Sequence, residues 1–65
     1  MMLQPGLVVQ NHDGELFLLL RIRQEEERGE WGFRGENWSM LKLSEGQLVN
    51  EMASLLLLPK FYRPL

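Results

Sequence analysis

Alternating apolar and polar residues in the first part of the chain predict a β-hairpin. A short β-favouring run, residues 7–10, is followed by Asn11-His12-Asp13-Gly14. Asp-Gly is a strong hairpin signal, because tight β-turns require a positive φ that these residue types tolerate. We therefore expect a tight turn at Asp13-Gly14 and a second strand that begins at Glu15 and ends near Gln24.

The second predicted strand is apolar on both faces in its first half and amphipathic in its second half. Successive side chains of a strand point to opposite faces. One face would have Leu16, Leu18, Leu20 and Ile22, and the other would have Phe17, Leu19, Arg21 and Arg23. A strand of this kind must be covered on both faces. A helix over residues 16–24 is the rival interpretation, since continuous apolar runs are ambiguous, but the Asp-Gly turn before it favours a strand.

The rest of the chain predicts two more strands and a helix. Residues 24–29 form a polar, acidic connection, residues 30–35 a third strand, Gly35-Glu36-Asn37 a turn, and residues 38–43 a fourth strand. From Ser44 the apolar spacing becomes helical, and Ser44 with Gln47 matches a capping box. We therefore expect a helix over residues 45–57, which Pro59 ends. A final strand near residues 52–58 is the alternative.

These elements predict a mainly β fold, either a small antiparallel meander or an SH3-like barrel of four to five strands, with a short C-terminal helix. Leu3-Gln4-Pro5-Gly6-Leu7-Val8-Val9, then a turn and the long second strand, resembles the start of SH3-like barrels. The resemblance covers about two thirds of the chain. It implies a last strand after a short 3₁₀ turn. It implies no binding residues, because the aromatic pair and acidic loop of signalling SH3 domains are missing.

We expect one domain over residues 1–65, with residues 59–65 as an extended tail. The core of so small a domain supplies only ~3–5 kcal/mol. Cysteine is absent and His12 is the only histidine, so neither a disulfide nor a structural zinc site can add stability. The chain has fourteen leucines, so the question is whether so small a core can bury all of them or whether some remain as a surplus. Surplus apolar side chains form an exposed patch, and such patches mark interfaces.

Charge and chemistry disfavour several functional classes. The net charge of −2 argues against a general nucleic-acid binder, which needs cations to displace phosphate counterions. Catalysis has little support, because His12 is the only conventional base near neutral pH and lies in the predicted turn. We expect no enzyme activity, no cofactor and no metal site. No transmembrane segment and no signal peptide are predicted, which makes the cytoplasm the expected compartment.

The expected function is a non-catalytic protein-binding or regulatory and assembly module, acting on a protein partner or by self-association. Trp and Arg are enriched at the centres of protein interfaces. The candidate binding residues are Phe17, Leu19, Trp31, Arg34, Trp38, Phe61 and Tyr62. The alternative is a nucleic-acid-binding module, in which arginines gather on one sheet face and an aromatic ring stacks on bases. That alternative requires the arginines to lie away from Glu25, Glu26 and Glu27.

Overall fold

The structure is a computed structural model that describes residues 1–24 and 36–65. Its elements are β1 (Val8–Asn11), β2 (Leu16–Gln24), β3 (Glu36–Lys42), β4 (Gln47–Met52), α1 (Ala53–Leu56) and β5 (Tyr62–Pro64). The five strands form one antiparallel sheet in the order β4-β3-β2-β1-β5. The predicted mainly β fold with a short helix near its end is confirmed.

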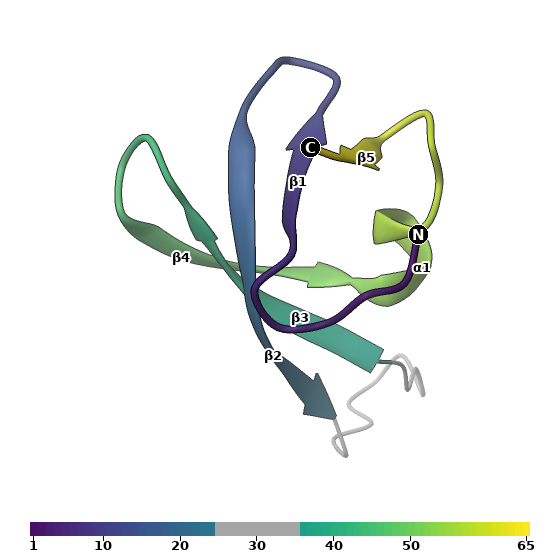
Figure 1. Cartoon of the computed structure of the whole chain (residues 1–65). Coiled ribbons are helices and arrows are strands. Elements are labelled where there is room, and N and C mark those ends of the chain that lie inside the picture. Colours follow the sequence, from purple (N-terminus) through teal and green to yellow (C-terminus); the bar gives the residue numbers. More distant parts are fainter. Residues whose placement is uncertain (25–35) are drawn as a thin grey trace, which may run out of the picture.

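The sheet is strongly curled, and its two edge strands, β4 and β5, do not pair with each other in the described part of the chain (Figure 1). The one-turn helix α1 follows β4 directly and contacts β3, β4 and β5. It therefore closes the gap between the two edges on the concave side of the sheet.

The first hairpin forms where the sequence predicts it. Gly14 has a φ of 87° and its N–H donates to the Asn11 carbonyl over 3.0 Å. The Asn11 side-chain oxygen accepts from the N–H groups of Asp13 (3.0 Å) and Glu15 (2.9 Å). Gly14 takes the left-handed conformation in this turn, and the Asn11 side chain pairs with the backbone N–H groups of the turn.

A β-bulge in β2 changes which face its second half presents. Leu19 pairs with Met40, but the next pair is Arg21 with Ser39, so Leu20 is an extra residue. The predicted alternation is right up to Leu19 and wrong beyond it. The bulge turns Arg21 away from the core, where an unpaired guanidinium would be costly to bury.

The helix expected over residues 45–57 is wrong, because most of this segment pairs with β3. Gly46 has a φ of 64°, and its N–H donates to the Lys42 carbonyl over 2.8 Å, which makes a turn and excludes a helix there. Leu48 pairs with Leu41 and Val49 with Met40. Only Ala53–Leu56 is helical. The alternative strand over residues 52–58 is also wrong, since β4 ends at Met52.

Two other predictions concern residues 30–37: one differs from the structure, and the other concerns residues that the structure does not describe. The third strand expected over residues 30–35 lies outside the described residues. The turn expected at Gly35-Glu36-Asn37 is not one at its described positions, because Glu36 and Asn37 begin β3 and pair with β2. The long second strand therefore has the predicted fourth strand as its direct neighbour.

The segment expected as a tail, residues 59–65, contains the fifth strand. Tyr62 pairs with Asn11 and Pro64 with Val9, which makes β1 an interior strand between β2 and β5. The Tyr62 ring meets the Phe17 ring edge-on, with 6.0 Å between centroids. This contact joins the last strand to the core.

The core lies on the concave face of the sheet. Its buried side chains are Val9, Phe17, Leu19, Trp38, Met40 and Leu56. Five of them come from β1, β2 and β3, and Leu56 reaches in from α1. The curl of the sheet and the helix thus cover one face only.

Candidate interaction surface

The face of the sheet opposite the core has a row of apolar side chains across four strands. Residues directly opposite each other in an antiparallel ladder share a face. Val8 is opposite Leu18, Leu18 is opposite Leu41, and Leu41 is opposite Leu48. Neighbouring strands lie about 4.8 Å apart. The four side chains therefore form one continuous row on the convex side.

Two more leucines widen this row toward the turns. Leu16 lies on the same face as Leu18, and the Leu43 N–H donates to the Leu16 carbonyl over 3.0 Å. We define the outer apolar face as Val8, Leu16, Leu18, Leu41, Leu43 and Leu48. Leu48 is 67% exposed and Leu43 is 43% exposed, whereas the other four are half-buried. None of the described elements covers this face, because α1 packs on the core side.

The charged side chains on this face are arginines. Arg63 is opposite Gln10, which is itself opposite Leu16, and Arg21 is opposite Ser39. Both arginines are exposed. Arg63 and Arg21 lie on opposite sides of the apolar row, Arg63 diagonal to Val8 and Arg21 diagonal to Leu41. A third exposed arginine, Arg23, is opposite Asn37 and lies on the same face, farther from the row than Arg21. Within the described strands, no Asp or Glu faces outward on this side of the sheet.

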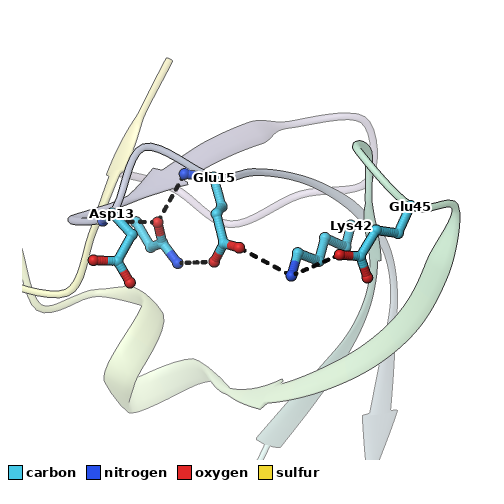
Figure 2. Close-up of polar contacts among 5 residues, drawn as sticks. Asp13, Glu15, Lys42 and Glu45 are labelled. Carbon is cyan, nitrogen blue, oxygen red and sulfur yellow. Dashed lines mark hydrogen bonds and ion pairs between the residues drawn. The ribbon is translucent and has the colours of Figure 1, made fainter.

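One lysine binds two carboxylates where the β1–β2 turn and the β3–β4 turn lie close together (Figure 2). Lys42 Nζ lies 2.9 Å from Glu15 Oε2 and 3.5 Å from Glu45 Oε2, and Asn11 Nδ2 donates to Glu15 Oε1 over 2.9 Å. The hydrogen bonds from Lys42 and Asn11 lower the pKa of Glu15, and Glu15 with Glu45 raises the pKa of Lys42. This network joins the first turn to the turn between β3 and β4.

Three of the residues expected to bind a partner lie in the core instead. Phe17, Leu19 and Trp38 are buried, so they do not form a surface. The curl of the sheet and Leu56 of α1 cover the face on which they lie. Trp31 and Arg34, also expected to bind, are outside the described residues.

The remaining two candidates, Phe61 and Tyr62, are half-buried and lie next to each other. They line a hollow of about 210 Å³, together with Gln10, Asn11, His12, Pro59 and Arg63. The Tyr62 hydroxyl donates to Glu51 Oε1 over 2.9 Å. Burial, together with Glu51, raises the pKa of Tyr62. This phenol already has a partner within the chain, which gives it a structural role between β5 and β4.

The chemistry available around His12 is limited. His12 is exposed in the first turn, and its Nε2 lies 3.6 Å from Asp13 Oδ1. Over residues 1–24 and 36–65, no group of three His, Asp or Glu side chains is placed to hold a metal ion. In the same ranges, no helix is long and apolar enough to cross a membrane.

Sequence reasoning missed the residues that make up the outer apolar face. It identified the two faces of residues 16–20 but assigned binding to Phe17 and Leu19 rather than to Leu16 and Leu18. It also placed Leu48 in a helix. The alternation of Leu41 and Leu43 was a usable signal, but only the register shows that these side chains meet Leu18 and Leu16.

Comparisons with protein-family models, with curated proteins and with solved structures find no match to this chain. The interaction surface is therefore defined by the register, exposure and charge of its own residues.

Proposed function

We propose that this chain is a non-catalytic protein-binding or assembly module that binds its partner with the outer apolar face. The observation that carries the proposal is the row of Val8, Leu18, Leu41 and Leu48 across four strands. Burying a large apolar side chain is worth about 1.5–3 kcal/mol. A small domain has little stability to spare, so a partner that covers this row stabilises it as well.

We also propose that the open sheet is an SH3-like barrel and that the protein acts in the cytoplasm. The last strand, Tyr62–Pro64, supports the barrel, because the resemblance implies a last strand; the turn before it is α-helical, at Ala53–Leu56, rather than 3₁₀. The fold alone does not indicate a function, since small barrels serve many purposes. The proposed binding role depends on the outer face only.

Nucleic-acid binding is the second candidate, and the outward direction of Arg21 and Arg63 favours it. Bases of single strands are held by stacking on aromatic rings. The aromatic side chains that the structure describes are Phe17, Trp38, Phe61 and Tyr62, and none of them belongs to the outer apolar face. A face of leucines without a described ring suits a protein better than a nucleic acid.

The test compares two pairs of exposed leucines. Leu43→Ser/Leu48→Ser changes the outer apolar face, and Leu57→Ser/Leu58→Ser makes the same chemical change beside α1, where exposure is 48% and 41%. Each immobilised variant is incubated with extract of the host, and retained proteins are identified. We expect the first variant to lose proteins that the parent and the second variant both retain. Equal retention by all three, with circular dichroism showing folded variants, contradicts the proposed function.

A further inference from the structure

The charges around the outer apolar face restrict what can cover it. Arg21 and Arg63 lie on opposite sides of the apolar row and are exposed, and the described strands place no carboxylate on this face. Arginine forms bidentate pairs with carboxylates, and its methylene stem packs on apolar surface. A partner segment with apolar side chains alone would leave two guanidinium groups partly desolvated and unpaired, which is costly.

We infer that the partner is a protein segment with apolar side chains flanked by carboxylates, which pair with Arg21 and Arg63 while the apolar side chains cover the leucine row. The inference rests on the proposed function and specifies the chemistry of the partner. A strand rise of about 3.4 Å and a strand spacing of about 4.8 Å put the two arginines on the order of 15 Å apart. A short peptide therefore spans both of them.

A second copy of the chain is a poor occupant for the same reason. Stacking two outer faces about a two-fold axis presents the same surface from each side. Arg21 and Arg63 of each copy would then find leucines, arginines and neutral polar side chains such as Gln10 and Ser39, but no carboxylate in the described part of the face. Like charges in an interface cost several kcal/mol. An acidic partner avoids this repulsion, because its carboxylates attract the arginines.

The test selects binders from a random peptide library displayed on phage, using the parent chain as bait. We expect enriched peptides to have several apolar residues and a negative net charge, and to lose binding to Leu43→Ser/Leu48→Ser. Exposed ion pairs are worth up to about fivefold in affinity each. Arg21→Glu/Arg63→Glu, which adds repulsion, should bind the selected peptides roughly tenfold more weakly or worse. The loss should shrink as salt rises from about 0.05 to about 0.5 M.

Lys60→Glu is the matched control, because it makes the same change of charge on an exposed side chain of the loop before β5. We expect it to leave peptide affinity within about twofold of the parent, since Lys60 lies outside the arginine pair that flanks the row. The single variant Arg21→Glu changes the net charge by the same amount as Lys60→Glu. If both variants lose the same peptide affinity, the effect is one of net charge alone, and the inference is overturned.

Other results separate the inference from the proposed function. Neutral or basic peptides that still require Leu43 and Leu48 overturn the acidic partner and leave the binding face intact. Selected peptides that bind the leucine variant as well as the parent overturn both. A concentration-dependent dimer of the parent, lost in the leucine variant, makes a second copy the occupant. A fluorescent single-stranded oligonucleotide that competes with the peptides in an arginine-dependent manner makes the occupant a nucleic acid. Each of the last two outcomes also overturns the inference.

Discussion

Replacing Leu56 by alanine tests whether the single turn of α1 is part of the core. Leu56 is fully buried, and it is the only buried residue of this helix. It packs with Trp38 and Met40, which come from β3, and so joins the helix to the concave face of the sheet. The neighbouring Leu57 is 48% exposed and gives a matched control with the same chemical change.

The expected loss can be estimated from the burial of the side chain. Leu56→Ala removes roughly three carbon groups, worth about 0.8 kcal/mol each when buried, or about 2.4 kcal/mol. A residual cavity adds on the order of 1 kcal/mol. We therefore expect a loss of about 3–4 kcal/mol in the free energy of unfolding. A domain of this length has roughly 3–10 kcal/mol in total, so the variant will be marginally folded. Leu57→Ala should cost less than about 1 kcal/mol.

Urea unfolding followed by circular dichroism measures the free energy of unfolding of both variants and of the parent. An unchanged slope m among the three indicates that unfolding stays two-state. If Leu56→Ala does not fold, Leu56→Val retains part of the side chain and brings the loss into the measurable range. Similar costs for Leu56→Ala and Leu57→Ala would refute the placement of α1 on the core. So would a loss below about 1 kcal/mol for Leu56→Ala, because burial in this cluster predicts several times that amount.

Two further predictions concern polar groups. The buried Trp38 Nε1–H has no acceptor in the described part of the chain, and an unpaired donor costs about 1–3 kcal/mol. Trp38→Phe removes it and leaves a cavity worth roughly 1 kcal/mol, so urea unfolding should show a net change within about 1 kcal/mol, and a loss above about 3 kcal/mol would argue against an unpaired donor. Glu15 has a pKa below the ordinary 4.5 because of Lys42 and Asn11, so its contribution to stability is full above that value and is lost as the pH falls through the lowered one. Glu15→Gln should therefore flatten the dependence of the urea midpoint on pH between about pH 5 and about pH 3, and parallel curves for parent and variant would contradict this role.

Features set by neighbouring residues could be predicted from the sequence. The first turn depends on Asn11, Asp13 and Gly14, which lie within four positions, and it formed as expected. The long second strand was also predicted, because alternation is a local property. The helix expected from residue 45 was not found, since Gly46 makes a turn and pairing with β3 outweighs the helical spacing of Leu48 and Val49.

Features set by distant residues could not be predicted in the same way. The pattern of residues 16–20 shows two apolar faces, but which face is covered depends on Leu56 and on the curl of the sheet. The bulge at Leu20 follows from pairing with β3, so the outward turn of Arg21 was not visible either. Three of the expected binding residues, Phe17, Leu19 and Trp38, are therefore found in the core, and other residues form the exposed apolar face.

The position of β1 inside the sheet has a consequence for how the protein is made. Its second neighbour, β5, is supplied by residues near the other end of the 65-residue sequence, as the pair Val9 and Pro64 shows. Non-local pairing of this kind slows folding, because the loop must close before its contacts form. During synthesis one edge of β1, with its two valines, stays unpaired until the last strand of the sheet has been translated. Until then this edge is open to aggregation, since unpaired strand edges are templates for wrong pairing.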